Sequence, residues 1–253
     1  MYTLKSCQKY TVDKWYSKIQ SWQCKSISGE LYYPSTTYKL FELSRSEVNN
    51  LLTMGAFTTD MKENIQQLFP AEYFFKISNR SPKDILEKEI EILDEDHRSI
   101  KLEKKIKQLS ILKVDTVEKV IDLILKSERV IEDFKLYLHE EDVDSLYLVF
   151  QPWRPNLGVG AEYRCFINNG KLVGVCLYKP EYYSTRHVIP IELIVYFINQ
   201  LLEIIDYDRF VVDVFELDSK IYFIEINPFE EFVDTFSFDW ELINNTNTLL
   251  ITL

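Results

Sequence analysis

The stretch FVVDVFELDSKIYFIEINP (Phe210–Pro228) decides the fold, because it reads as two strands joined by a short turn. Each half is a run of apolar and β-branched residues, which is typical of a strand. Asp213 lies inside the first half, and Glu225 and Asn227 lie near the end of the second. Strand side chains alternate between two faces, so Glu225 and Asn227 are predicted to point the same way.

Whether Asp213 joins them depends on the turn. A three-residue loop of residues 218–220 pairs position 217 with 221 and places Asp213 opposite Glu225. A two-residue loop sends Asp213 to the other face, because a slip of one residue reverses a strand. In the first register two carboxylates and an amide oxygen converge, and this ligand set favours Mg²⁺. The alternative is an edge strand whose carboxylates are solvated.

The sequence on either side of this stretch predicts an α+β fold. EYRCFI and KLVGVCLY flank Asn169-Gly170, which indicates a second hairpin, and YLVFQP (147–152) is a further strand. A buried helix is predicted over 191–205. Towards the N-terminus, helices are predicted at 45–54, in the charged segment 83–108, after a cap at Asp115, and from about Glu128, with a strand at 73–77. Helices followed by antiparallel strands are typical of α+β proteins.

Composition narrows the function classes. The chain has 253 residues, 46% of them hydrophobic, which is enough for one large domain or two lobes. It has 6 glycines and neither glycine-rich phosphate motif, so Walker and Rossmann sites are not expected. A net charge of −11 argues against general nucleic-acid binding. The apolar helix at 191–205 is too short and too polar to span a membrane, and the four scattered cysteines indicate reduced thiols.

Three groups of cations are candidates for binding phosphate. Lys76 lies in the apolar strand YFFKI, where an unpaired ammonium is costly, although a lysine that reaches out to water is the alternative. Arg80 and Lys83 lie in the turn and helix start that follow, where backbone N–H groups favour anions. Arg164 in EYRCFI either binds a ligand or forms a structural salt bridge with Glu162 or another acid.

These motifs, taken in order, resemble a known family. The set is FFKISNRSPKD, LVFQPW, GAEYRCFINNGKLVGV, Tyr182-Tyr183, FVVDVFE and EINPFEEFVDTFSFDWEL, with CQKYTVDKWY near the start. Together they resemble the cell division cycle protein 123 family, also called D123. The resemblance implies an ATP-grasp-like fold in which two lobes with antiparallel sheets clamp ATP. On this basis the lobes are expected at 1–145, with the phosphate-binding lysines, and 146–253, with the metal-binding hairpin.

The resemblance also implies roles for individual residues. Nucleotide contacts are implied for one set of side chains, in which the hinge residues line the adenine: Lys76, Lys83, Asp84, Phe150, Gln151, Trp153, Glu162 and Arg164. Metal ligation is implied for Asp213, Glu225 and Asn227. The chain departs from the family pattern at Gln151-Pro152, at Leu177-Tyr178 and at Glu225, and Lys179 is a possible substitute for a nucleotide contact there.

For function, the resemblance implies an ATP- and Mg²⁺-binding chaperone in the cytoplasm that assembles translation initiation factor 2. Its partner is the gamma subunit, to which it promotes joining of the alpha subunit. Two alternatives stay open. One is an ATP-dependent ligase that acts through an acyl phosphate, so enzymatic activity is undecided. The other is a bacterial or viral effector that uses the same fold in a host cytoplasm. A monomer is expected.

Overall fold

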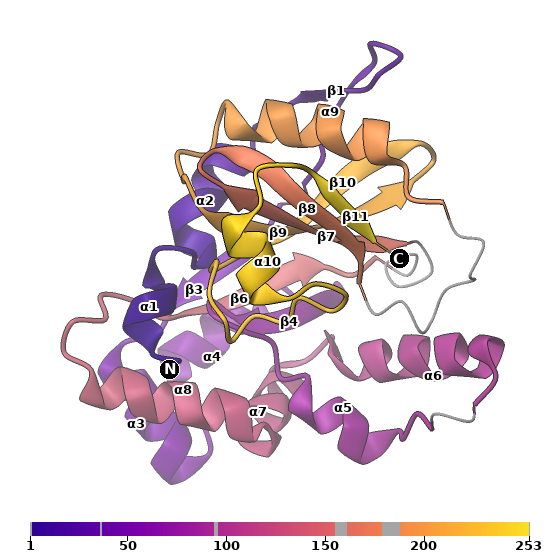
Figure 1. The fold of residues 1–253 in the computed structure, drawn as a ribbon. Helices are drawn as coiled ribbons and strands as arrows, with labels where there is room; N and C mark the ends of the chain where they lie inside the picture. The colour runs from indigo at the N-terminus through magenta and orange to yellow at the C-terminus, as the bar shows by residue number, and fades with distance from the viewer. Residues whose placement is uncertain (1, 36, 94–95, 155–160, 179–187, 253) are drawn as a thin grey trace. The chain divides into compact units, whose positions relative to one another are not determined.

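The computed structural model describes residues 2–35, 37–93, 96–154, 161–178 and 188–252 (Figure 1). The chain forms two compact units. The hairpin unit comprises Tyr10–Thr36 and Asn156–Leu253, and the helical unit comprises Tyr2–Lys9 and Thr37–Pro155. These units differ from the predicted lobes in two places. Residues 10–36 belong with the C-terminal part of the chain, and the strand predicted at 147–152 belongs with the N-terminal part.

The hairpin unit is built on a five-stranded sheet in the order β10-β9-β7-β8-β11. All its neighbouring strands are antiparallel except β11, which runs parallel to β8. Its strands are β7 (Glu162–Asn168), β8 (Lys171–Leu177), β9 (Phe210–Leu217), β10 (Lys220–Asn227) and β11 (Leu250–Thr252). Its helices are α2 (Val12–Ile19), α9 (Ile191–Leu202) and α10 (Trp240–Asn245), and β1 (Cys24–Lys25) pairs with β2 (Leu31–Tyr32) in a small second sheet.

The β9–β10 hairpin has the predicted register, but the predicted loop is wrong. Asp213 lies opposite Glu225, whereas the turn has two residues, because Lys220 pairs with Leu217. Asp218 and Ser219 both have left-handed φ angles, 51° and 58°, as a tight hairpin turn requires. A β-bulge between Phe223 and Glu225 then adds one residue to β10. The bulge restores the register that the shorter turn alone would have reversed.

The β7–β8 hairpin confirms its prediction, with Asn169 and Gly170 at positive φ in the turn. The side chains of Phe166 and Val211, which pair across β7 and β9, share one face of the sheet. Both pack with Ile243 of α10. That face is therefore covered by α10 and by the segment of residues 228–239 before it. Helix α9 packs against β8 and β10.

The segment of residues 10–36 joins the hairpin unit through aromatic contacts and backbone bonds. The ring centroid of Trp15 lies 4.9 Å from that of Phe223, and that of Trp22 lies 5.3 Å from that of Phe197. The Phe223 N–H donates to the carbonyl oxygen of Pro34. Trp15 is buried, and an aromatic pair adds about 0.5–1.5 kcal/mol beyond its area burial. This explains why an N-terminal segment folds onto C-terminal strands.

The helical unit is built on a four-stranded antiparallel sheet in the order β3-β6-β4-β5. Its strands are β3 (Lys39–Glu42), β4 (Tyr73–Ile77), β5 (Lys113–Val114) and β6 (Tyr147–Pro152). Its helices are α1 (Leu4–Gln8), α3 (Arg45–Met54), α4 (Thr59–Gln66), α5 (Asp84–Glu89), α6 (Arg98–Ile111), α7 (Val117–Lys126) and α8 (Glu128–His139). The strand β6 lies between β3 and β4, and this position explains why it belongs to this unit.

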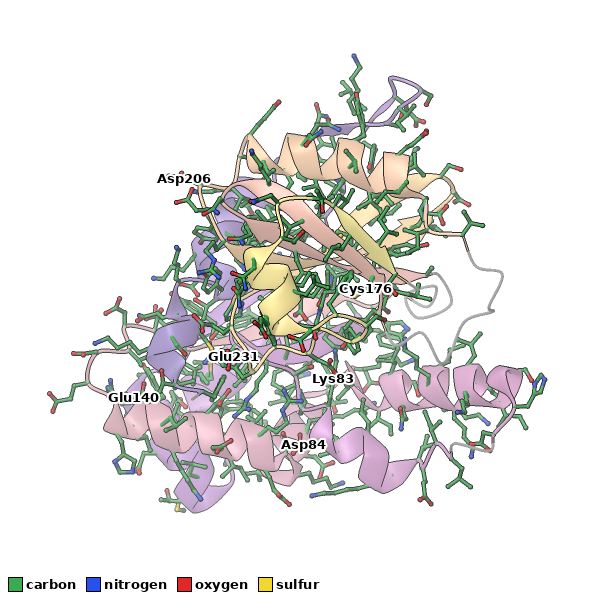
Figure 2. The ribbon with its side chains drawn as sticks, viewed as in Figure 1. Lys83, Asp84, Glu140, Cys176, Asp206 and Glu231 are labelled. Atoms are coloured by element: carbon green, nitrogen blue, oxygen red, sulfur yellow. The ribbon has the colours of Figure 1, made fainter. Side chains whose placement is uncertain are left out.

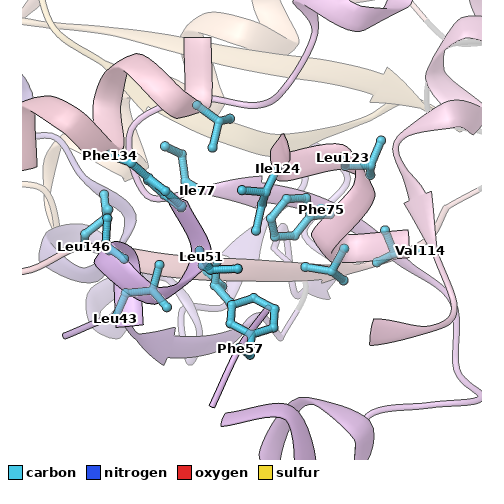
Figure 3. Close-up of a cluster of buried hydrophobic side chains, with 14 of the residues drawn as sticks. Leu43, Leu51, Phe57, Phe75, Ile77, Val114, Leu123, Ile124, Phe134 and Leu146 are labelled. Carbon is cyan, nitrogen blue, oxygen red and sulfur yellow. The ribbon is translucent and has the colours of Figure 1, made fainter. Parts of the chain in front are cut away.

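The core of the helical unit lies between this sheet and its helices (Figure 3). Phe75 and Ile77 of β4 meet Leu51 of α3, Ile124 of α7 and Phe134 of α8 there, and all five side chains are fully buried. Each such side chain contributes about 1.5–3 kcal/mol through burial. The strand β4 is therefore held rigidly.

Most predicted helices are present. Helix α3 begins after Ser44, whose hydroxyl accepts the Glu47 N–H as predicted. The cap of α7 is Thr116 rather than Asp115, because the Thr116 hydroxyl accepts the Lys119 N–H. The charged segment forms α5 and α6, so helix is present there as predicted.

Candidate functional site

The candidate site of the hairpin unit centres on a buried ion pair. Arg164 of β7 lies directly opposite Asp213 of β9, so both side chains emerge on the face that segment 228–239 covers. Arg164 Nε donates to Asp213 Oδ1 and Nη2 donates to Oδ2, each at 2.8 Å. Arg164 is 6% exposed and Asp213 is 3% exposed. The salt bridge to an acid, left open by the sequence, is therefore present, and Asp213 is its partner.

The same guanidinium binds the segment that covers it. Arg164 Nη1 donates to the carbonyl oxygen of Asp234 at 2.6 Å. The rings of Tyr178 and Phe236 lie 5.0 Å and 4.9 Å from its central carbon. Burial acts to lower the pKa of Arg164, but the charge and hydrogen bonds of Asp213 outweigh it, so the pKa is raised. Arg164 is therefore permanently cationic.

Glu225 and Asn227 complete the cluster from β10. Glu225 pairs directly with Asp213, which puts both side chains on one face. Asn227 Nδ2 donates to Asp213 Oδ2 at 3.1 Å. The predicted convergence of Asp213, Glu225 and Asn227 is thus confirmed as geometry.

The carboxylate of Asp213 is engaged by other side chains of the unit. Both of its oxygens accept hydrogen bonds from Arg164, and Oδ2 also accepts one from Asn227. Over the described ranges, no group of three or more His, Cys, Asp or Glu side chains could hold a metal ion. The cation that neutralises Asp213 is Arg164. Glu225 and Asn227 keep the ligand chemistry that Mg²⁺ requires.

Two further predicted residues belong to this unit. Glu162 begins β7, two positions before Arg164, so alternation puts it on the same face, where it is half-buried. Lys179 lies outside the described residues. Sequence reasoning missed Tyr178, Asp234 and Phe236 as parts of the cluster. The signal was the aromatic run in FEEFVDTFSFDW, which it used only as a family motif.

In the helical unit, Lys76 of β4 is 9% exposed and pairs with Val149 of β6. Because Phe75 and Ile77 point into the core, alternation sends Lys76 to the opposite face of the sheet. Gln151 lies on that face too, since it pairs with Phe74. The side chains of Lys76 and Gln151 are therefore brought to one face, as a shared role requires.

The side chain of Phe150 is on the core face instead. It is fully buried, and its ring centroid lies 5.5 Å from that of Phe75 and 5.6 Å from that of Phe41. Because the side chain is in the core, the implied place of Phe150 in an adenine hinge would rest on its backbone. Trp153 follows β6, with Lys113 Nζ 5.9 Å from its ring centroid.

Lys83 and Asp84 lie at the start of α5 (Figure 2). Asp84 accepts a hydrogen bond from the Ser127 hydroxyl at 2.6 Å and another from the Arg129 N–H at 3.2 Å. Ser127 is the N-cap of α8. Asp84 therefore has a structural contact, which ties α5 to the start of α8 and which the sequence did not predict.

Arg80, a predicted anion binder, is also engaged. Its guanidinium bonds to both oxygens of Asp133 and stacks on the Tyr2 ring, whose centroid lies 4.4 Å away. Asp133 is fully buried on α8. Arg80 is therefore a structural cation of the helical unit rather than a residue held ready for a ligand.

Comparisons with known proteins agree with this fold. The family model D123 matches residues 104–249. A translation initiation factor eIF2 assembly protein from Xenopus laevis is 31% identical over 144 residues, which are 52% of this chain and 42% of that protein. One from Schizosaccharomyces pombe is 26% identical over 150 residues, which are 54% of this chain and 47% of that protein. The matched region thus spans less than half the length of these curated relatives.

A solved structure is similar over almost the whole chain. Cdc123 from Schizosaccharomyces pombe has a TM-score of 0.68 at 18% identity, covering 99% of this chain and 98% of that one. At this identity the likeness concerns the fold alone. The predicted α+β class, with a largely antiparallel sheet in each unit, is confirmed. Among the described residues, no helix is both long and apolar enough to cross a membrane.

Proposed function

This chain belongs to the D123 family, and on that premise we propose that it is an ATP-binding assembly factor for translation initiation factor 2. The relatives described above carry this role in their names. The gamma subunit is the proposed partner and joining of the alpha subunit the proposed step, in the cytoplasm.

The observation that carries ATP binding is the buried Arg164 cluster. All three guanidinium nitrogens are bonded to Asp213 or Asp234, so Arg164 would act on a phosphate through its fixed charge rather than through a hydrogen bond. Its aromatic neighbours, Tyr178 and Phe236, keep the group dehydrated. A fixed, permanent cation on a sheet face with two carboxylates and an amide is typical of a ligand site rather than of a core.

Each unit, taken by itself, has candidate nucleotide contacts. In the helical unit we expect Lys76 to contact phosphate, because a largely buried ammonium benefits from an anionic ligand. Lys83, at the N-cap of α5, is a further candidate. In the hairpin unit, Mg²⁺ would be held by Glu225 and Asn227, where it would neutralise phosphate charge.

Partner binding is tested by capture on an immobilised gamma subunit. We expect the wild-type protein to be retained, and more strongly with ATP than without. A protein that binds ATP but is never retained by the gamma subunit would overturn the assembly role and leave the nucleotide role intact.

ATP binding is tested by calorimetric titration of Lys76→Met beside Lys39→Met. Lys39 is an exposed lysine of the same sheet, so its variant controls for the general loss of a charge. We expect Lys76→Met to weaken ATP binding by about tenfold or more, the usual scale for losing one charged hydrogen bond, and Lys39→Met to leave it unchanged. Equal ATP affinities for the two variants would show that Lys76 does not contact the nucleotide.

A further inference from the structure

The Arg164 cluster balances its charges differently from a typical magnesium site. Two carboxylates, Asp213 and Glu225, face one another across β9 and β10. Two carboxylates on one face normally call for a bound cation. Here a cation is already part of the chain, because the guanidinium of Arg164 bridges both oxygens of Asp213.

We propose that Arg164 is the built-in counter-ion of Asp213 and keeps divalent cations from this carboxylate. The magnesium of a bound nucleotide is then held without Asp213. This inference rests on the proposed function only where it concerns the magnesium of a bound nucleotide. The exclusion of a divalent cation from Asp213 concerns the chain and a bare metal ion, so it does not depend on that function.

The first argument is geometric. A Mg²⁺ ligand lies 2.0–2.1 Å from its metal, and each Asp213 oxygen lies 2.8 Å from a guanidinium nitrogen. A metal on either oxygen would therefore lie within about 5 Å of that nitrogen. At such a distance two like charges repel strongly in a buried site. A metal ion could therefore bind Asp213 only against the repulsion of the Arg164 charge.

The second argument is that Arg164 is held in place from several directions. Its third nitrogen, Nη1, is bound to the Asp234 carbonyl. Phe236, one of the two rings beside it, has a left-handed φ of 54°, an uncommon conformation for a residue with a side chain. Releasing the guanidinium would break the bidentate pair and the bond to segment 228–239. A metal ion alone provides no compensation for these losses.

The charge of Arg164 also keeps the neighbouring oxygen ligands from forming a metal site. Without its charge, Asp213, Glu225 and Asn227 would form a set of hard oxygen ligands on one face. The positive charge therefore suppresses a divalent site that the three side chains would otherwise create.

The test is binding of Mn²⁺ alone, measured by electron paramagnetic resonance as loss of the free-ion signal. We expect no specific site in the wild-type protein or in Arg164→Lys, which keeps the charge. Arg164→Gln should bind Mn²⁺ at least about tenfold more tightly, because hard oxygen ligands are released. Arg164→Gln combined with Asp213→Asn should lose that gain. Arg80→Gln is the matched control, since it removes the arginine of another buried pair and should gain nothing.

Two results would overturn the proposal. One is a wild-type protein that binds Mn²⁺ as tightly as Arg164→Gln. The other is a gain that survives in the double variant, since Asp213 would then not be the ligand released.

A second measurement on the wild-type protein covers the case in which Arg164→Gln does not fold. Mn²⁺ broadens the NMR signals of amides close to it. With Mn²⁺ alone we expect the amides of Val212, Asp213 and Val214 to stay sharp, and saturable broadening centred on them would contradict the proposal. Because neither experiment contains a nucleotide, a failure of ATP or partner binding leaves its outcome unaffected.

Discussion

Among the described residues, each unit has an arginine bonded to a buried aspartate, and the surroundings of these two pairs differ. Arg80 and Asp133 lie at the edge of the helical unit, where the Tyr2 hydroxyl also donates to both Asp133 oxygens at 3.1 and 3.2 Å. Arg164 and Asp213 lie at the centre of a sheet, beside a second carboxylate and an amide. The first pair joins a turn to a helix. The second pair lies on a sheet face that also carries the side-chain oxygens of Glu225 and Asn227. For this reason we interpret the first pair as structural and the second as part of a candidate site.

The largest expected effect is the loss of stability when each pair is broken. Asp213→Ala leaves Arg164 buried among aromatic rings, and we expect it to lower the free energy of unfolding by about 3–5 kcal/mol. Asp133→Ala should cost less, because the side chain of Arg80 is 18% exposed and is also bonded to Glu132. Denaturant unfolding measures the free energy of unfolding of both variants. Equal decreases would show that the two pairs contribute equally to stability.

The next effect concerns the attachment of segment 228–239. Burial raises the pKa of Cys176 to about 12, so only about 10⁻⁴ of this thiol is ionised at pH 8. Its Sγ lies 3.6 Å from the Thr235 carbonyl oxygen, beneath that segment. Arg164→Gln removes the bond to Asp234, and we expect alkylation of Cys176 to become about tenfold faster as the segment opens.

Mass spectrometry after a timed pulse of iodoacetamide measures this rate. Cys7, buried in the helical unit, is the internal control and should keep its rate. An unchanged rate at Cys176 would mean that Arg164 does not hold the segment, and the two arginine pairs would then be alike.

A smaller effect distinguishes structure from function at Asp84. Its carboxylate bonds to the Ser127 hydroxyl and the Arg129 N–H. We expect Asp84→Ala and Ser127→Ala each to cost about 1 kcal/mol of stability, as the loss of a helix cap does. If calorimetry instead shows that Asp84→Ala alone abolishes ATP binding, the helical unit also contains a ligand carboxylate.

The smallest effect is in the turn that helps to set the register of Asp213. Ser219 has a φ of 58°, which disfavours any residue except glycine. Ser219→Gly should raise the free energy of unfolding by about 0.5–1 kcal/mol, because it relieves a left-handed strain of about 1–2 kcal/mol while the flexibility of glycine in the unfolded chain offsets part of that gain. A loss of stability on thermal unfolding would indicate that the serine side chain makes a contact that matters more than the strain.

These results show what the sequence could predict. Glu225 and Asn227 share a face because side chains alternate along one strand, and that rule needs no tertiary information. The partner of Arg164 is different, since Asp213 lies 49 positions further along the chain and no local pattern encodes the register between β7 and β9. The bulge after Phe223 could not be predicted from the local sequence either. The pairing of Asp213 with Glu225 was therefore predicted correctly, but from a three-residue loop that the structure does not have.

The division into units shows the same limit. YLVFQP was correctly predicted as a strand, but its neighbours β3 and β4 lie more than 65 residues earlier in the chain. Nothing near Trp15 and Trp22 in sequence shows that they pack on Phe223 and Phe197. Local elements follow from local sequence, whereas membership of a sheet depends on distant partners.

The central claim, that the Arg164 face binds a nucleotide's phosphates, is tested most directly by titrating ATP calorimetrically with and without Mg²⁺. The wild-type protein and Glu225→Gln, which keeps size but loses charge, are compared. The account predicts that wild type binds ATP more tightly with Mg²⁺, and that Glu225→Gln binds ATP but loses most of the magnesium effect. A wild-type protein that binds no ATP, or a Glu225→Gln protein with an undiminished magnesium effect, would contradict it.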